Sequence, residues 1–338
     1  MTDLFQSSDP VLARARAARM PDEILARAVE ACDHLFGVPP VVIALFSGGT
    51  DSMLAAEVAA RHPRFLCAAQ WDTRTGLPVV GEWSDEWSAR HGLALRRVPT
   101  PESYADIVTG KTEGKKGGFA GGFPGEGAHG FYQNRLKDRA RVAFQRQIRA
   151  SGELPKGAPI LYVSGIRAAE SARRRRLLRT GPLEVRYRNK TTGGRLVREK
   201  RPRREVHVSP LLFLTDEGKA RQFAARGWQP NPAAQALGIS AECMCLCNGD
   251  AAEEKAARAF DPAWGEGRAE LEAAVRDAGY PWGPGESPPS GWLGTDRGRL
   301  HASELAKAEL AAPTLFDAPV PMCAGACTRK LAMKKAAA

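Results

Sequence analysis

The sequence predicts an α/β protein in which helices cover both faces of a parallel, twisted β-sheet, with a small C-terminal region that contains cysteines. Two observations predict this class. Short apolar runs rich in β-branched residues alternate with stretches of helical periodicity, which is typical of parallel strands joined by helices. The runs are also continuously apolar, which indicates strands buried on both faces.

Residues 11–100 are expected to form three strands and four helices. Apolar positions at helical spacing fill residues 11–35, and Pro21 is suited to open a second helix there. The elements that follow are expected at 41–46 (strand), 52–62 (helix), 63–72 (strand), 79–92 (helix) and 93–100 (strand).

Residues 110–130 contain nine glycines and are expected to form a mobile loop, either a lid or a linker. The elements expected after it are a basic helix at 131–150, a strand at 158–166, a helix at 168–178, a long hairpin at about 183–208, a helix at 215–227 and a helix between 251 and 279. Thr215 is a suitable N-cap for the helix that follows it.

The chain carries a formal net charge of +11. Much of it is concentrated in residues 173–204, where 14 lysines and arginines stand against two glutamates. Such a stretch favours DNA or RNA as a partner, contacted through phosphates without sequence readout. The alternative is a solvated basic hairpin with no partner.

No apolar run approaches the roughly 18 residues that a membrane span needs. Residues 1–20 also lack the charged-then-apolar layout of a signal peptide. We therefore expect a cytoplasmic protein with no membrane partner.

The motif SGGTDS follows the first predicted strand and opens a helix. Such a turn is an anion site, because the first N–H groups of the helix and the positive end of its dipole meet there. An acid within it would repel bare phosphate, which implies a bridging metal ion, most simply Mg²⁺. No GxxxxGKS or GxxxxGKT sequence occurs, so the turn is not the usual P-loop. The candidate ligand-binding residues are Ser47, Gly48, Gly49, Thr50, Asp51 and Ser52.

This pattern resembles the hallmark of the PP-loop ATP pyrophosphatase superfamily, whose adenine nucleotide alpha hydrolase-like domain is a Rossmann-like (HUP) fold. The resemblance implies that the turn holds the pyrophosphate part of ATP. It also implies cleavage between the α- and β-phosphates, with adenylation of a substrate. The chain is then expected to divide into N-terminal helices at 1–38, a nucleotide-binding domain at 39–240 and the cysteine-containing region at 241–338.

Four further stretches, in the same order along the chain, resemble the phosphoadenosine phosphosulfate (PAPS) reductase-like branch: WDTRTGLPVVGEWSDEWSARHGL, NRLKDRA, SGIRAAES and SPLLFLTDEGKARQFAARGWQPNPAAQALG. The resemblance covers about residues 41–247. It implies that Asp72 lies near the adenosine and that Lys137 faces phosphate or substrate. It also implies that Arg167, preceded by Gly165, lies beside the phosphates, where Glu170 could hold it in place.

One departure from the branch is informative. Its reductases carry a C-terminal ECGLH or ECGIH motif, which this chain lacks, whereas the ATP-type turn is intact. The combination favours an ATP-dependent enzyme that adenylates a substrate for sulfur transfer, including nucleic-acid modification by DNA phosphorothioation or thiolation, with a sulfur-donor protein as a further partner. The alternatives are a reductase of adenylyl-sulfate compounds and a nucleotide-binding protein without turnover.

Seven cysteines are present, an odd number that argues against a disulfide framework in a cytoplasmic chain. Cys32 and Cys67 stand in apolar surroundings and are expected in the core. The others form the groups ECMCLC and CAGAC, which could supply four soft ligands to zinc or to an iron–sulfur cluster. The resemblance favours a [4Fe-4S] cluster; reduced cysteines without metal are the alternative. The expected ligands are Cys243, Cys245, Cys323 and Cys327, with Cys247 as a substitute.

Overall fold

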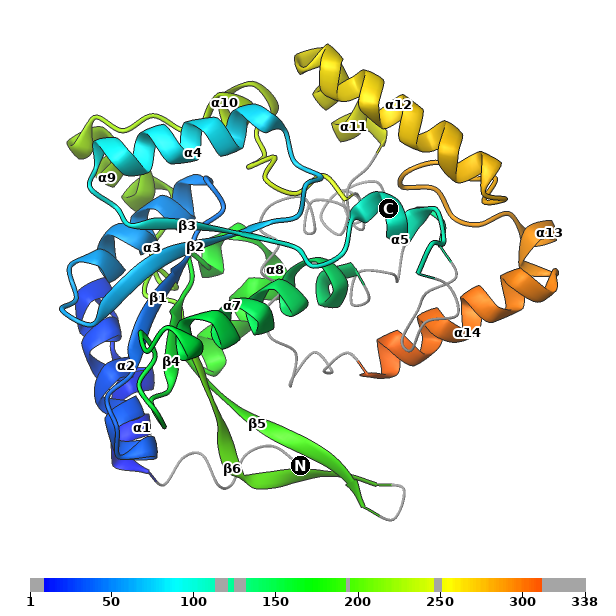
Figure 1. Cartoon of the computed structure of the whole chain (residues 1–338). Coiled ribbons are helices and arrows are strands. Elements are labelled where there is room, and N and C mark those ends of the chain that lie inside the picture. The colour runs from blue at the N-terminus through cyan, green and yellow to red at the C-terminus, as the bar shows by residue number, and fades with distance from the viewer. Residues whose placement is uncertain (1–8, 113–120, 125–131, 193–194, 246–250, 312–338) are drawn as a thin grey trace. The chain divides into compact units, whose positions relative to one another are not determined.

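The computed structural model of the chain describes residues 9–112, 121–124, 132–192, 195–245 and 251–311 (Figure 1). Its first elements are α1 (Pro10–Ala17), α2 (Pro21–Phe36), β1 (Val41–Leu45), α3 (Thr50–Ala60), β2 (Phe65–Asp72), α4 (Pro78–Arg90), β3 (Leu95–Pro99) and α5 (Tyr104–Val108). The middle of the chain forms η1 (Asn134–Asp138), α7 (Arg139–Ala150), β4 (Ile160–Val163), η2 (Ala168–Glu170), α8 (Ala172–Arg175), η3 (Arg176–Arg179), β5 (Leu183–Thr192) and β6 (Arg195–Val208). The last elements are α9 (Asp216–Arg226), α10 (Pro232–Leu237), α11 (Ala251–Phe260), α12 (Pro262–Asp277), α13 (Ser290–Leu293) and α14 (Asp296–Ala311).

The six strands form one sheet in the order β3-β2-β1-β4-β6-β5. β1 pairs in parallel with β2 and with β4, and β4 pairs in parallel with β6; β5 is antiparallel to β6. The middle of β1 and the whole of β4 are buried, as their continuous apolar sequences predict. The predicted α/β class with a mostly parallel sheet is therefore confirmed.

The strand order reverses between β1 and β4, because β2 and β3 follow on one side of β1 whereas β4 lies on the other. Ligands of open α/β sheets bind outside the carboxyl ends of the strands at such a reversal. β1 ends at Leu45 and β4 ends at Val163. The SGGTDS and SGIRAAES motifs follow these two strand ends and therefore occupy that position.

Most predicted elements are present, and three differ. The helix expected at 168–178 is broken into the short elements η2, α8 and η3. The single helix expected between 251 and 279 is two helices, because Asp261 caps a new one by accepting from the backbone N–H of Trp264. The basic helix expected at 131–150 contains a π-helical stretch, η1, near its start. Most of the predicted glycine-rich loop lies outside the described residues.

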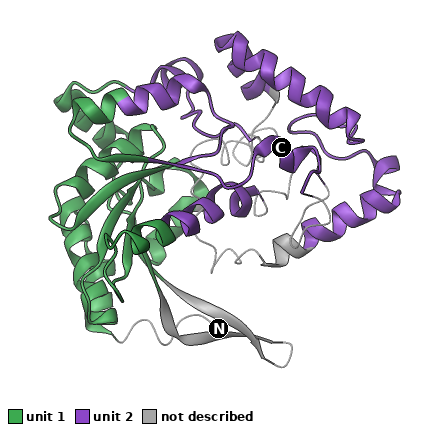
Figure 2. Cartoon of the chain, in the orientation of Figure 1, with its two compact units in different colours: residues 1–70, 86–96, 145–229 green, residues 71–85, 97–144, 230–338 purple. Residues whose placement is uncertain are grey.

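The chain forms two compact units (Figure 2). The first comprises residues 1–70, 86–96 and 145–229 and holds most of the sheet; the second comprises residues 71–85, 97–144 and 230–338. The chain passes several times between the units, so each contains segments that are distant in sequence. The division at residues 38 and 240 stays a prediction.

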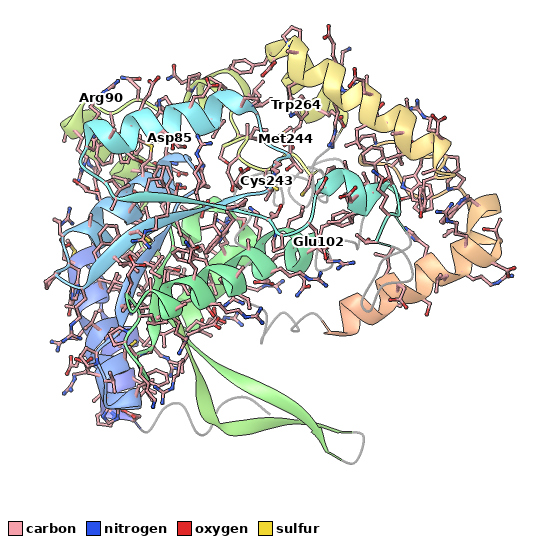
Figure 3. The ribbon with its side chains drawn as sticks, viewed as in Figure 1. Asp85, Arg90, Glu102, Cys243, Met244 and Trp264 are labelled. Carbon is pink, nitrogen blue, oxygen red and sulfur yellow. The ribbon has the colours of Figure 1, made fainter. Side chains whose placement is uncertain are left out.

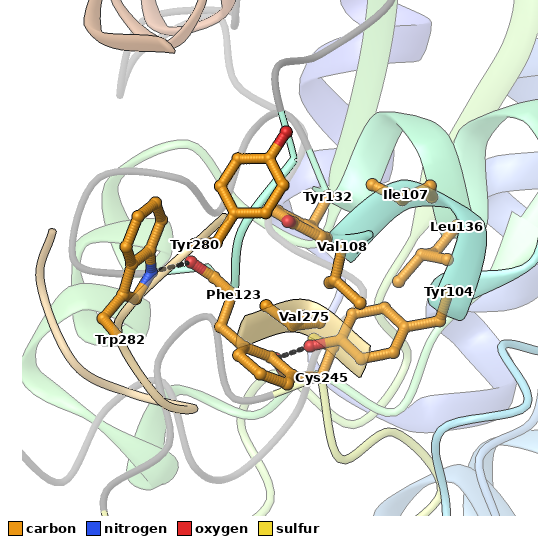
Figure 4. Packing of buried hydrophobic residues seen from close by; sticks show 10 residues of the cluster. All are labelled: Tyr104, Ile107, Val108, Phe123, Tyr132, Leu136, Cys245, Val275, Tyr280 and Trp282. Atoms are coloured by element: carbon orange, nitrogen blue, oxygen red, sulfur yellow. Dashed lines mark hydrogen bonds between the residues drawn. The ribbon is translucent and has the colours of Figure 1, made fainter. Parts of the chain in front are cut away.

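The second unit has an aromatic core of its own (Figure 4). Its members are Tyr104, Ile107, Val108, Phe123, Tyr132, Leu136, Cys245, Val275, Tyr280 and Trp282. The Tyr104 hydroxyl donates to the Cys245 carbonyl (3.0 Å), and the Trp282 indole N–H donates to the Phe123 carbonyl (2.9 Å). These bonds satisfy buried polar groups and join Tyr104 and Phe123 to residues that lie more than 100 positions later in the chain. Among the described residues, no helix combines the length and the apolar character needed to cross a bilayer.

Candidate functional site

The SGGTDS turn connects β1 to α3 in the first unit. Gly48 has a φ of 68°, a left-handed conformation that glycine adopts without strain. Gly49 is the N-cap of α3, and a glycine has no side chain to accept from the first N–H groups of the helix. The Ser52 hydroxyl closes the turn: it accepts from the Ser47 N–H (3.1 Å) and donates to the Gly49 carbonyl (2.7 Å). The result is a helix N-terminus built to receive an anion.

Gly165 supports this turn from the end of β4. A Cβ atom built at position 165 would lie 2.5 Å from the carbonyl carbon of Asp51 and 2.7 Å from the nitrogen of Ser52. Only glycine allows the two backbone segments to approach so closely. The two sequence motifs therefore meet through their backbones.

Arg167 is the central cation of the site, and its side chain is only 2% exposed. Its Nε donates to Oδ1 of Asp51 (2.8 Å), one terminal nitrogen donates to Oδ1 of Asp216 (2.8 Å), and the other donates to the Leu214 carbonyl (3.1 Å). Burial lowers the pKa of Arg167, but the charge of Asp51 and the bonds to both carboxylates outweigh it, so this pKa lies above its ordinary value. The guanidinium is thus held charged beside the turn.

Helix α9 supplies two charged residues that the motifs did not identify. Asp216 is 68% exposed, and the hydrogen bond from Arg167 holds its pKa below the usual range. The Lys219 ammonium lies 3.4 Å from Oδ1 of Asp51. Thr215 fixes the start of the helix by accepting from the Gly218 N–H (3.1 Å). Two cations therefore converge on the carboxylate of the turn.

Glu170 contacts Arg167 through the backbone of Arg167 and not through its guanidinium. Its carboxylate accepts from the backbone N–H of Arg167 (2.8 Å) and pairs with the guanidinium of Arg174. Burial raises the pKa of Glu170 against the attraction of Arg174. Glu170 thus orients the backbone at Arg167, while the Arg167 side chain is held by Asp51 and Asp216.

The second unit holds Asp72 and Lys137, the other two expected site residues. The Asp72 carboxylate accepts from the Arg74 N–H (2.9 Å), and Arg74 itself has a positive φ of 54°. The loop continues to Thr75, whose hydroxyl donates to the sulfur of Cys243 (3.6 Å) and accepts from the Met244 N–H (3.1 Å). Cys243 and Met244 are labelled in Figure 3. The loop after β2 and the ECMCLC segment are therefore bonded to each other.

Lys137 forms a buried ion pair with Glu242, at 3.2 Å between Nζ and Oε2, with side chains 5% and 8% exposed. Burial raises the pKa of Glu242 to about 7, although the charge of Lys137 acts in the opposite direction. Lys137 belongs to the π-helical η1, a kind of irregularity that is frequent at functional sites. The sequence motif pointed to Lys137 and gave no sign of its partner.

The expected metal ligands are only partly described. Cys243 is half-buried beside Thr75, and Cys245 is buried in the aromatic core of the second unit. Within the described ranges, no three His, Cys, Asp or Glu side chains are grouped as ligands of a metal ion. Cys247, Cys323 and Cys327 lie outside the described residues. The four-cysteine site therefore stays a prediction.

Comparisons with known proteins gave matches in structure. No family model matches the sequence, and no curated protein matches it. Among solved structures, the chain is similar to a PAPS reductase from Candida auris in its phosphate complex, with 14% identity, 70% of this chain and 95% of that chain covered, and a TM-score of 0.43. It is also similar to an FMN adenylyltransferase from Candida glabrata in complex with FAD and inorganic pyrophosphate (13% identity, 70% and 66% covered, TM-score 0.35). A third similar structure is the U34-tRNA thiolase from Methanococcus maripaludis with its [4Fe-4S] cluster (11% identity, 75% and 78% covered, TM-score 0.33). Solved proteins similar to this chain thus include a PAPS reductase, an adenylyltransferase and a tRNA thiolase.

Proposed function

We propose that the chain is an ATP pyrophosphatase of the PAPS reductase-like kind, which adenylates a substrate for sulfur transfer. The observation that carries the proposal is the buried Arg167, held between Asp51 and Asp216 beside a glycine turn that opens α3. A fixed cation next to a helix N-terminus suits a polyphosphate whose negative charge increases as its anhydride bond breaks.

In this proposal the Ser47–Ser52 turn holds the pyrophosphate part of ATP through backbone N–H groups and the serine hydroxyls. A substrate oxygen attacks the α-phosphorus, the bond to the bridging oxygen breaks, and pyrophosphate leaves. Arg167 and Lys219 stabilise the charge that develops on the leaving group. Asp51 and the two serine hydroxyls are hard oxygen ligands of the type that Mg²⁺ prefers, and Mg²⁺ bound there would neutralise further phosphate charge.

The second unit supplies the remaining proposed roles. Asp72 contacts the adenosine, and Lys137 contacts phosphate or substrate, with Glu242 setting its position. A sulfur nucleophile then attacks the carbon or phosphorus atom that bears the adenylated oxygen of the substrate. The bond to that oxygen breaks, and AMP leaves with the oxygen. The sulfur comes from a donor protein, through a cysteine. Cys243, Cys245, Cys323 and Cys327 would hold a [4Fe-4S] cluster, with zinc as the alternative metal, and a bound cluster would supply iron that can bind sulfur.

Incubation of the full chain with labelled ATP and Mg²⁺, with and without nucleic acid, tests the reaction. We expect AMP and pyrophosphate in equal amounts. Asp51→Asn should lower the rate by at least about 10²-fold, whereas Asp22→Asn, the same change at an exposed position, should not. Formation of sulfite from PAPS without ATP, together with no AMP under any condition, would identify a reductase and overturn the proposal. ATP binding without either product would indicate a nucleotide-binding protein.

Metal analysis after anaerobic purification tests the cysteine site separately. A cluster predicts about four iron and four sulfide per chain, and a tetrahedral site predicts about one zinc. Cys323→Ser should remove the metal and make the chain after residue 241 more sensitive to protease. Full metal content in that variant would exclude Cys323 as a ligand.

A further inference from the structure

Most of the net positive charge of the chain lies in a short segment that the ATP reaction does not use. Residues 186–204 contain nine lysines and arginines and one glutamate, a net charge of +8 out of +11 for all 338 residues. The rest of the chain is therefore close to neutral. A charge this concentrated is expected to attract a polyanion to one place on the molecule.

This segment is a two-stranded ribbon in the structure. β5 and β6 pair in antiparallel register from Leu183–Val208 out to Thr192–Arg195. β4 pairs with β6 along Glu205–Val208, which is the part of β6 nearest its carboxyl end. In the described pairing, residues 195–204 of β6 thus have β5 as their partner strand. We call residues 186–192 and 195–204 the ribbon; the seven residues of its shorter strand span about 23 Å.

The ribbon extends past the amino ends of the parallel strands, whereas the candidate ATP site lies at their carboxyl ends. Ile160 at the start of β4 pairs with Glu205 of β6, and the two strands run in the same direction. Residues before Glu205 therefore extend past the amino end of β4, whereas Gly165 and Arg167 follow its carboxyl end. The ribbon is a separate surface within the first unit, and its partner need not compete with ATP.

The form of the ribbon distinguishes between kinds of nucleic acid. Like charges on paired strands repel one another, and a two-stranded hairpin is marginally stable alone, so a polyanionic partner would stabilise it. The major groove of B-DNA is about 12 Å wide and admits a two-stranded ribbon between two rows of phosphates. The major groove of duplex RNA is deep and narrow, and side chains do not reach into it. The dimensions therefore favour duplex DNA.

We propose that the ribbon is a DNA-binding arm that enters the major groove of duplex DNA and neutralises phosphates on both of its walls. This surface stands independently of the proposed ATP reaction. With about five phosphates neutralised, log K would fall with log salt at a slope of about −4.5. That slope corresponds to a loss of roughly 500-fold in affinity between about 50 and 200 mM salt.

Fluorescence anisotropy of a labelled DNA duplex with the full chain tests the proposal. The ribbon variant is R188T/K190T/R198T/K200T, in which threonine preserves strand propensity. The control variant removes the same charge from exposed positions of the first unit: R90Q/R146Q/R149Q/K156Q. We expect the ribbon variant to lose at least about 10-fold in affinity at about 100 mM salt, with a salt slope smaller by about 3 to 4. The control variant should stay within about 3-fold of the unchanged chain. Equal losses in both variants, or no DNA binding by the unchanged chain, would overturn the proposal.

Two measurements on the unchanged chain do not depend on any variant folding. Guanine N7 faces the major groove, so bound chain should protect it from methylation by dimethyl sulfate. Binding without protection contradicts entry into the groove. A duplex RNA of the same sequence should bind at least about 10-fold more weakly, and equal or tighter binding of RNA contradicts the choice of DNA.

Asp51→Asn should leave DNA affinity unchanged, so failure of the ATP reaction and failure of the arm are distinguishable.

Discussion

Gly165→Ala tests whether the two motifs really meet through their backbones. The new Cβ would lie 2.5 Å from the carbonyl carbon of Asp51, 2.6 Å from its oxygen and 2.7 Å from the nitrogen of Ser52. None of these backbone atoms can rotate aside. Ordinary contact begins at 3.4 Å, so the end of β4 and the turn must separate by about 0.9 Å. The substitution therefore displaces the proposed phosphate site without removing any functional group.

The expected consequences affect both stability and activity. Inserting a methyl group into a closely packed region costs about 1–3 kcal/mol of unfolding free energy. A displacement of about 1 Å at a reacting site can lower the rate roughly 10²-fold. Urea unfolding measures the first effect, and kcat/KM for AMP formation from ATP measures the second. Both quantities should fall together in this variant.

Gly267→Ala is the matched control. Gly267 lies within α12, and a Cβ there would meet no atom within 4 Å. The same substitution should raise helix stability by up to about 1 kcal/mol and leave AMP formation unchanged. If Gly165→Ala unfolds at the same urea concentration as the unchanged chain and keeps its kcat/KM, the close approach of the two backbones is wrong.

Three further predictions concern buried charges. Arg167→Leu leaves the Asp51 carboxylate without its main partner and should cost about 3–5 kcal/mol of unfolding free energy, measured with urea. Arg167→Lys should not restore AMP formation, because an ammonium lacks the planar pair of donors that reaches both carboxylates. Full activity in either variant would contradict the role of Arg167 in the reaction. Lys137→Met leaves the buried Glu242 carboxyl without its cation and should cost up to about 3–5 kcal/mol of unfolding free energy, and less at a pH where Glu242 takes up a proton. Combining it with Glu242→Leu should recover most of that loss; additive losses would show that the pair is not coupled. Burial lowers the pKa of His301 from 6.5 to about 4, so its proton uptake favours the unfolded chain as pH falls through that window. The unfolding free energy should drop by up to about 3 kcal/mol from pH 7 to pH 4. The plot of unfolding free energy against pH should be flatter by that amount for His301→Gln, whereas parallel plots would exclude His301 as the cause.

The local pattern of the sequence was sufficient to predict most of the strands of the sheet and the SGGTDS turn. Continuous β-branched runs are stable mainly as buried strands, and glycines after such a run leave the N-terminus of the next helix open. The N-cap at Thr215 was also readable, since a hydroxyl there satisfies the Gly218 N–H whatever else surrounds it. These features depend on neighbours within a few residues.

Helix boundaries were less predictable where distant groups compete for the backbone. Residues 168–178 have good helix formers, yet the Ala168 N–H donates to the Leu212 carbonyl and Ser171 is extended. Those contacts hold Arg167 and Glu170 in place and interrupt the helix. The break at Asp261, by contrast, carries a local signal, an acid before a proline, that could have been read.

The sequence by itself determined the α/β class, the order of its strands along the chain and the glycine turn that opens α3, because short-range periodicity, turn chemistry and charge are encoded locally. The tertiary structure decided which charges meet. Asp216 joins Arg167 across 49 residues, and Glu242 joins Lys137 across 105. No local pattern specifies such pairs, because they form only when folding buries the two cations. The charge of each buried cation must then be balanced by a carboxylate that the strand order brings near.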